Sequence, residues 1–169
     1  MPDETALDRL NLAEAAEAER ELLACCASRR WADELLARRP YPDLARLRGV
    51  SETVIGELSW DDILQALAAH PRIGERAAGA GREAAWSRAE QAGAGAATTE
   101  TQEDLVVGNV AYEERFGYVF LICATGLSAE AMLFALRERL GNDPDSEREV
   151  VRVELNKIVD LRLGKAFAS

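Results

Sequence analysis

Alanine and leucine dominate this chain, and β-branched residues are sparse. Alanine and leucine favour helices, whereas strands favour β-branched and aromatic residues. Over most of the chain, apolar residues recur three and four positions apart, which is the period of an amphipathic helix. The sequence therefore predicts an all-α fold, a bundle of about eight helices.

The length and charge of the chain restrict its class. Its 169 residues suit one domain, and no internal repeat or convincing boundary divides residues 1–169. The formal net charge of −10 argues against sequence-independent binding to nucleic acid or anionic membranes. The longest strongly apolar run, residues 118–124, is far shorter than the roughly 20 residues that span a bilayer.

The beginning of the chain and its cysteines indicate a compartment. The acidic start, Met1 to Glu4, lacks the basic and apolar segments of a secretory signal. The three cysteines are an odd number, and Cys25 and Cys26 are adjacent, unlike the pattern of a disulfide scaffold. We expect a cytoplasmic protein in which Cys25 and Cys26 are small buried apolar groups.

In the first half of the chain, capping residues and prolines place the helices. Asn11, with Glu14 three residues later, predicts a helix to about residue 27. Ser28, Asp43 and Ser59 each predict the start of a further helix, and Pro71 breaks the last of these. The expected buried positions of the first helix are Leu12, Ala15, Ala16, Leu22, Leu23 and Cys26.

The second half is expected to hold four helices. Residues 72–85 are interpreted as a loop or short irregular helices, residues 83–91 as a helix, and the Gly- and Ala-rich residues 93–97 as a flexible link. A helix over residues 101–116 ends at Gly117, and residues 118–125 fit either a buried extended segment or a short core helix. Ser128 caps a helix to Leu140, and residues 146–149 match a capping box for the last one. The positions of the 101–116 helix expected to face inward are Leu105, Val106, Val110 and Tyr112.

His70 is the only histidine, and Pro71 fixes the direction of the turn that carries it. An imidazole titrates near neutrality, so His70 could donate or accept a proton in catalysis. A lone histidine at a helix end is more often a polar cap or a packed core histidine. A lone histidine without a Cys-x-x-Cys motif gives little support to a zinc site.

Other polar residues are placed where they could bind a small molecule. Ser87, Glu90 and Gln91 share one helical face and could clamp a polar heterocycle, or simply form a solvated face. Arg162 lies between two leucines of the last helix. It is either a rim residue with its stem on apolar surface or a two-pronged ligand for a carboxylate.

Together these motifs are more specific than any one of them. In chain order they are Trp31 with Arg39-Pro40-Tyr41, His70-Pro71-Arg72-Ile73-Gly74-Glu75, Ser87-x-x-Glu90-Gln91-x-Gly93, Asn109-x-x-Tyr112-x-x-x-Phe116 to Ala124, and Lys157 to Leu163. Over nearly the whole chain, this combination resembles the OHCU decarboxylases. These enzymes act on 2-oxo-4-hydroxy-4-carboxy-5-ureidoimidazoline (OHCU), in the last step of urate degradation.

The resemblance implies an all-α, cofactor-free lyase, usually a homodimer, that converts OHCU to (S)-allantoin and CO2. By motif match, His70 is the catalytic acid/base, and Glu90 and Arg162 stand at the other catalytic positions. The residues implied to bind this small-molecule substrate are Pro71, Ser87, Gln91, Phe120, Leu121, Ile122, Cys123 and Ala124. No metal site is implied.

Two other classes of function remain open at this point. In a non-catalytic helical interaction module, His70 and Glu90 would be structural, and replacing His70 would leave function near normal. In a metal-dependent hydrolase, Glu and Asp residues would bind the metal, and the lone histidine argues against this class.

Overall fold

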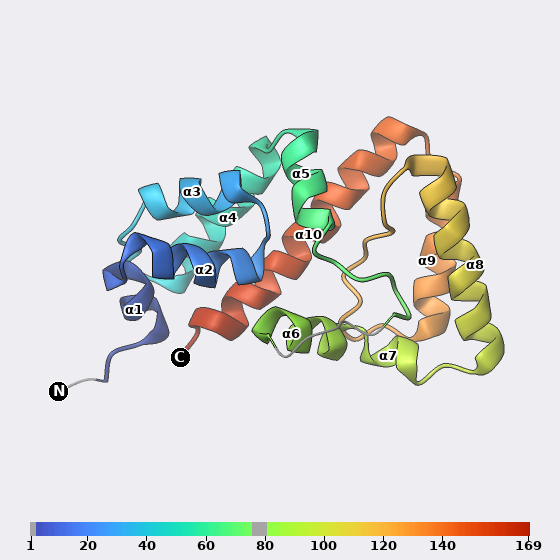
Figure 1. The fold of residues 1–169 in the computed structure, drawn as a ribbon, viewed down its shortest axis with the longest axis horizontal. Helices are drawn as coiled ribbons and strands as arrows, with labels where there is room; N and C mark the ends of the chain where they lie inside the picture. The colour runs from blue at the N-terminus through green and yellow to red at the C-terminus, as the bar shows by residue number, and fades with distance from the viewer. Residues whose placement is uncertain (1–2, 76–80) are drawn as a thin grey trace. The chain divides into compact units, whose positions relative to one another are not determined.

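The computed structural model describes residues 3–75 and 81–169, and Figure 1 shows the path of the chain through them. The predicted all-α fold is confirmed, because these residues form ten helices and no strand. They divide into two compact units. Unit 1 comprises Met1–Ala66 and Asn156–Ser169, and unit 2 comprises Leu67–Leu155. Residues 76–80, part of the expected 72–85 loop, lie outside the described residues, as does the Met1–Pro2 start.

The helices of unit 1 begin largely where the caps predict. Ser28 accepts a hydrogen bond from the amide of Trp31 (3.2 Å), and Asp43 accepts one from the amide of Arg46 (2.8 Å). Ser59 caps the next helix in the same way. The helices are α1 (Ala6–Leu12), α2 (Ala15–Cys25), α3 (Arg29–Ala37), α4 (Leu44–Glu57), α5 (Trp60–Leu67) and the part of α10 (Pro144–Phe167) that follows Leu155.

The helix start predicted at Asn11 is wrong. Asn11 lies in α1, and its amide bonds to the backbone of Tyr41 as donor (2.9 Å) and as acceptor (2.8 Å). Thr5 caps α1 through a capping box with Asp8, and the chain is extended at residues 13 and 14. Because of this break, the expected apolar stripe is also partly wrong: Leu22 and Cys26 are buried, but Leu12, Ala15 and Ala16 are exposed.

The core of unit 1 satisfies its few polar groups internally. The indole of Trp31 donates to the hydroxyl of Ser51 (3.0 Å), and the hydroxyl of Tyr41 donates to the carbonyl of Leu35 (2.7 Å). Cys25 and Cys26 are buried, as predicted, and desolvation raises the pKa of the Cys26 thiol to about 12. Cys26 is therefore an inert packing group at neutral pH.

Unit 2 contains α6 (Arg82–Glu90), α7 (Ala92–Gly95), α8 (Thr99–Phe116), α9 (Ala129–Leu140) and α10 as far as Leu155. Gly117 ends α8 in the left-handed conformation (φ 85°), and Ser128 caps α9, both as predicted. Residues 118–124 form no helix, and Phe120, Leu121, Ile122 and Ala124 are buried, which excludes the short core helix and leaves the buried extended segment.

The flexible link predicted at residues 93–97 is wrong. Residues 92–95 form α7, which packs on α9, and Ala94 is 2% exposed. A Cβ at Gly93 would lie 2.1 Å from the carbonyl oxygen of Leu127, so glycine permits this close packing. The sequence does not predict this packed helix, because a run of glycine and alanine shows almost no periodic pattern of apolar side chains.

The inward face of α8 is only partly as expected. Leu105 and Tyr112 are buried, but Val106 is 61% exposed and Val110 is 50% exposed. Gly108 and Asn109 are the other buried residues of α8. A small residue and an amide thus replace the apolar side chains on which the prediction relied.

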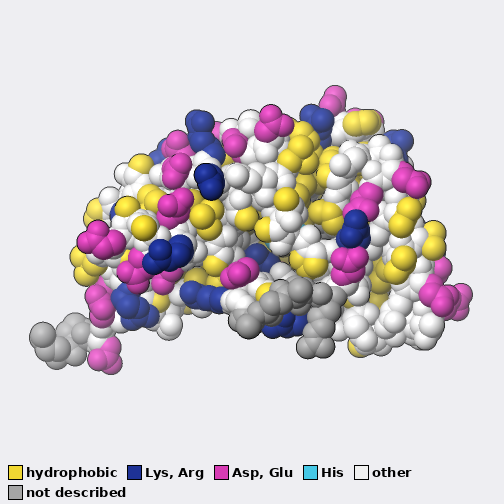
Figure 2. All heavy atoms as spheres, viewed as in Figure 1, with side chains coloured by type: hydrophobic (Ala, Val, Ile, Leu, Met, Phe, Trp, Pro, Cys, Tyr) yellow, Lys and Arg dark blue, Asp and Glu magenta, His cyan; other side chains and the backbone are white. Residues whose placement is uncertain are grey.

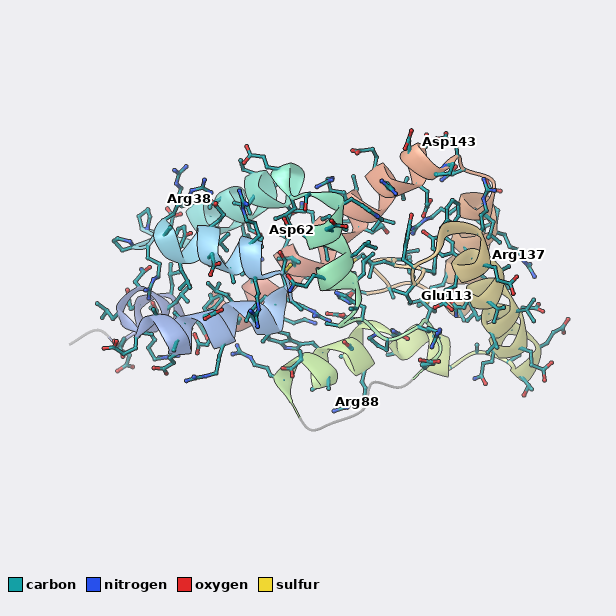
Figure 3. The ribbon with its side chains drawn as sticks, turned by 45° about the horizontal axis from the view of Figure 1, so that its top comes forward. Arg38, Asp62, Arg88, Glu113, Arg137 and Asp143 are labelled. Carbon is teal, nitrogen blue, oxygen red and sulfur yellow. The ribbon has the colours of Figure 1, made fainter. Side chains whose placement is uncertain are left out.

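The capping box predicted at residues 146–149 is also wrong. α10 begins earlier, at Pro144. The carboxylate of Asp143, which is labelled in Figure 3, accepts hydrogen bonds from the amide (3.0 Å) and hydroxyl (2.6 Å) of Ser146. Glu147 instead turns into the core of unit 2, where it is fully buried.

Glu147 belongs to a buried polar network that also includes Arg139 and Tyr112. The Arg139 guanidinium donates to one Glu147 oxygen through Nε (2.9 Å) and Nη2 (2.7 Å), and the Tyr112 hydroxyl donates to the same carboxylate. The third arm of the guanidinium donates to the carbonyl of Leu121 (2.6 Å). Its carbon lies 4.5 Å from the centre of the Phe120 ring. This network fixes the extended segment from inside unit 2.

In the described part of the chain, no helix is both long and apolar enough to cross a bilayer. On the face drawn in Figure 2, basic and acidic side chains are interspersed.

Candidate active site

His70 lies just beyond the end of α5, on the wall of a cavity of about 310 Å³. Its amide donates to the carbonyl of Leu67 (2.9 Å), and Pro71 then prevents the helix from continuing. The volume is at the lower end of the range for small-molecule sites. The cavity is lined by Ala68, Ala69, His70, Pro71, Glu83, Ala84 and Ser87. The structure thus brings together three of the predicted site residues, His70, Pro71 and Ser87.

Two polar residues of α6 are buried on the same helical face. Ser87 is 6% exposed and Glu90, one turn later, is 8% exposed, so a solvated polar face is excluded for both. Ser87 lines the His70 cavity, whereas Glu90 is not among its described lining residues. A buried carboxylate one turn from the cavity wall needs polar partners, which makes it a candidate for orienting a neighbouring group.

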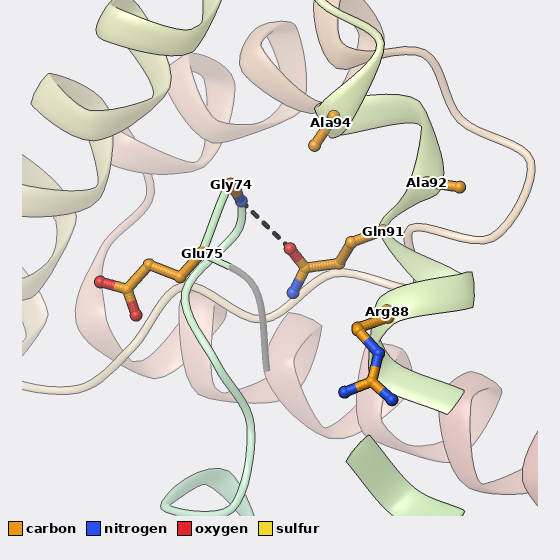
Figure 4. Close-up of a pocket in the computed structure, with 7 residues that line it drawn as sticks. Gly74, Glu75, Arg88, Gln91, Ala92 and Ala94 are labelled. Atoms are coloured by element: carbon orange, nitrogen blue, oxygen red, sulfur yellow. Dashed lines mark hydrogen bonds between the residues drawn. The ribbon is translucent and has the colours of Figure 1, made fainter. Parts of the chain in front are cut away.

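The amide of Gln91 holds the chain that follows His70. Its oxygen accepts a hydrogen bond from the Gly74 amide (3.0 Å), drawn in Figure 4, and its nitrogen donates to the carbonyl of Pro71 (3.5 Å). Gln91 lines a second cavity of about 260 Å³ together with Arg88 and Glu75. The amide retains one donor and one acceptor site beyond these bonds, so substrate contact by Gln91 stays a prediction.

The same loop is fixed to α8 at two points. The Asn109 amide donates to the carbonyl of Ile73 (2.8 Å), and Arg72 donates to Glu113 (2.8 Å), which is labelled in Figure 3. Arg72 also pairs with Glu75 (3.3 Å) at the surface. The His70 loop is therefore anchored within unit 2 on both α8 and Gln91.

The extended segment 120–124 is largely occupied by packing. Phe120, Ile122 and Ala124 belong to the apolar core of unit 2, and Cys123 is half-buried. The Cys123 amide donates to the carboxylate of Glu154 (3.3 Å). The described lining of the two cavities above contains none of residues 120–124, so their contact with a substrate stays a prediction.

The sequence analysis did not identify the residues that hold this segment, Arg139 and Glu154. Each is charged, yet Arg139 is 7% exposed and Glu154 is 8% exposed. The available signal was a charged residue at a position that the helical period places among apolar residues on the buried face, because such a residue must find a partner.

Arg162 lies in unit 1, on the last turns of α10, and is 5% exposed. The interpretation of Arg162 as a rim residue is wrong, because a rim arginine keeps its guanidinium in water. Its positive charge partly opposes the rise in the Cys26 pKa. A buried guanidinium is suited to binding an anionic oxygen.

The described residues contain no group of three His, Cys, Asp or Glu side chains that could hold a metal ion. Among the described lining residues, the groups that can take part in chemistry are the His70 imidazole, the Ser87 hydroxyl and the Glu83 carboxylate. An imidazole beside a small polar cavity is suited to moving a proton to or from a bound metabolite.

Comparison with known proteins identifies close relatives. The chain is 33% identical over 153 residues to the uric acid degradation bifunctional protein TTL of Arabidopsis thaliana, covering 89% of this chain and 47% of that protein. It is 40% identical over 96 residues to an Amia calva protein named 2-oxo-4-hydroxy-4-carboxy-5-ureidoimidazoline decarboxylase, covering 56% of this chain and 55% of that protein. The matches therefore span about half the length of these two relatives.

Solved structures share the fold. The crystal structure of an OHCU decarboxylase in the presence of (S)-allantoin matches with a TM-score of 0.77 and 28% identity, over 93% of this chain and 100% of that one. A crystal structure of (S)-allantoin synthase matches with a TM-score of 0.70 at 21% identity, which shows the fold alone. The sequence model of the OHCU decarboxylase family matches residues 11–164, almost the whole of both units. The chain belongs to the OHCU decarboxylase family.

Proposed function

We propose that this chain decarboxylates OHCU to (S)-allantoin and CO2, the last step of urate degradation. The observation that carries the proposal is the cavity that His70 shares with Pro71 and Ser87, in a chain of this family. Its volume of about 310 Å³ suits a small metabolite such as a ureidoimidazoline.

The chemistry divides among three residues. When the carbon–carboxylate bond breaks, the electron pair delocalises into the adjacent ring C=N, and a proton must reach one face of the carbon. His70 relays the proton of the ring hydroxyl or protonates that carbon. Glu90 orients the imidazole or binds the ureido N–H groups, and Arg162 binds an anionic oxygen. The support for Glu90 and Arg162 is their burial and their place in the motifs of the family.

We also propose the domain organisation, oligomeric state, cofactor requirement and compartment of the enzyme. The two units act as one functional domain over residues 1–169, supported by a family match that runs through both. The enzyme works as a homodimer and without a cofactor, as its family resemblance implies. The three cysteines are present as thiols, and two of them are buried, which suits a reducing cytoplasm.

The handedness of the product tests the proposed activity. OHCU generated in situ is divided between purified protein and buffer, and circular dichroism follows the appearance of allantoin. We expect rapid formation of the (S) enantiomer with the protein and a racemic product without it, because the active site delivers the proton to one face. A racemic product at the buffer rate would instead favour the interaction module.

Replacing Arg162 with lysine separates substrate binding from packing. Lysine keeps the charge and a similar stem but lacks the planar donor fork. We expect Arg162→Lys to lower kcat/KM more than tenfold, which is about 1.4 kcal/mol or more of transition-state binding. Kinetics and thermal melting are measured together. A melting temperature that falls while kcat/KM holds would assign Arg162 to packing.

Exhaustive chelation should leave turnover unchanged. The proposed chemistry uses the imidazole and the conjugated ring of the substrate, so no step requires a metal. Turnover is compared before and after incubation with EDTA and gel filtration. Activity that disappears and returns with one added divalent metal would support the hydrolase class instead.

A further inference from the structure

The loop that carries His70 is held by contacts of very different burial. Arg72 and Glu113 form an ion pair whose side chains are 49% and 27% exposed, so water and salt weaken it. Asn109, in contrast, is 3% exposed, and its hydrogen bond to the Ile73 carbonyl lies in the interior of unit 2. The contact with Asn109 is therefore the anchor that solvent does not compete for.

The Asn109 contact is connected to His70 along the backbone through Ile73, Arg72 and Pro71. Ile73 is 4% exposed and belongs to the core of unit 2, so its carbonyl needs a protein donor. Without one, the backbone at residue 73 would have to turn that carbonyl toward water. Pro71 lies between Ile73 and His70, and its fixed φ angle transmits a backbone shift rather than absorbing it.

We propose that Asn109 is a positioning residue for His70: its amide holds the Ile73 carbonyl and thereby sets where the imidazole lies in the cavity. The inference rests on the proposed function for the catalytic importance of His70. It assigns to Asn109 no contact with the substrate. The hydrogen bond from Asn109 fixes where the Ile73 carbonyl lies. A leucine at residue 109 would fill a similar volume but would not hold that carbonyl in place.

The single histidine of the chain makes this inference directly observable. In protein labelled with ¹⁵N-histidine, every imidazole signal comes from residue 70. We expect Asn109→Leu, which keeps the volume but removes the donor, to displace or split these signals at fixed pH. Asn109→Ala removes the donor without any risk of crowding and should act in the same direction.

Kinetics provide the second readout. A misplaced imidazole slows proton transfer more than it weakens binding, so we expect kcat to fall about tenfold or more while KM stays within about twofold. A role confined to stability would lower the melting temperature and leave both the imidazole signals and kcat unchanged.

Asn11→Leu is the matched control. Asn11 also bridges backbone through its amide, with two hydrogen bonds to Tyr41, but it lies in unit 1. We expect this variant to lose stability and to keep the wild-type His70 signals.

Three results would overturn the proposal: unchanged imidazole signals in folded Asn109 variants, equal displacement in Asn11→Leu, or failure of both Asn109 variants to fold. If the wild-type protein yields only racemic allantoin at the buffer rate, the proposed function fails, and the imidazole signals still decide the role of Asn109.

Discussion

Replacing His70 with alanine or asparagine is expected to abolish most turnover of OHCU and to leave the helical spectrum unchanged. The imidazole is the group on the cavity wall that can carry a proton in either direction near neutral pH. General acid–base catalysis contributes about 10²- to 10⁴-fold, so we expect kcat to fall by that order. His70 is half-buried outside the core, so the melting temperature should change little.

Added imidazole serves as the control for this prediction. It should restore part of the activity of His70→Ala, where the side chain leaves space, and less in His70→Asn, where the amide fills that space. Full activity in either variant, with an unchanged spectrum, would show that His70 does not carry the proton.

Removing the charge of Glu147 is expected to lower the free energy of unfolding by several kcal/mol. Glu147→Gln leaves the buried guanidinium of Arg139 without its anion. Breaking a buried pair on one side costs about 3–5 kcal/mol, because the remaining charge stays desolvated. Chemical denaturation should show this loss in the free energy of unfolding.

The exposed ion pair of Asp104 and Arg137 is the comparison. Its Arg137 Nη2 and Asp104 Oδ2 atoms lie 3.5 Å apart, and the side chain of Asp104 is 42% exposed and that of Arg137 62% exposed. Asp104→Asn should therefore cost no more than about 1 kcal/mol. The double variant Arg139→Leu/Glu147→Leu should recover part of the loss, since it leaves no unpaired charge. A small effect of Glu147→Gln would show that the pair is hydrated in solution.

The sequence predicted the helix starts that depend on hydrogen bonds between residues close together in the chain. The side-chain oxygens of Ser28, Asp43 and Ser128 cap helices as predicted, because an N-cap bond spans only two or three residues. Asn11 fits the same signal and fails, because Tyr41, thirty residues away, binds its amide instead. Residue spacing alone does not reveal such a long-range competitor.

For the candidate site too, the sequence predicted the features set by neighbouring residues and missed those set by distant segments. The His70-Pro71 turn and the shared helical face of Ser87 and Glu90 follow from chain-local geometry, whereas the burial of that face is visible only in the structure. Asn109 and Arg139 were missed as supporting residues. Their importance comes from the backbone carbonyls that they bind, which belong to segments distant in sequence.

The division of α10 between the two units has a consequence for synthesis on the ribosome. Unit 2 is one continuous stretch, Leu67–Leu155, and can complete its core as soon as it emerges. Unit 1 begins emerging first, but its buried Val159, Leu163 and Phe167 are translated last. Domains commonly fold in the order of translation. Here the N-terminal helices must wait with apolar surface uncovered until unit 2 has been made, and this interval is when the nascent chain most needs a chaperone.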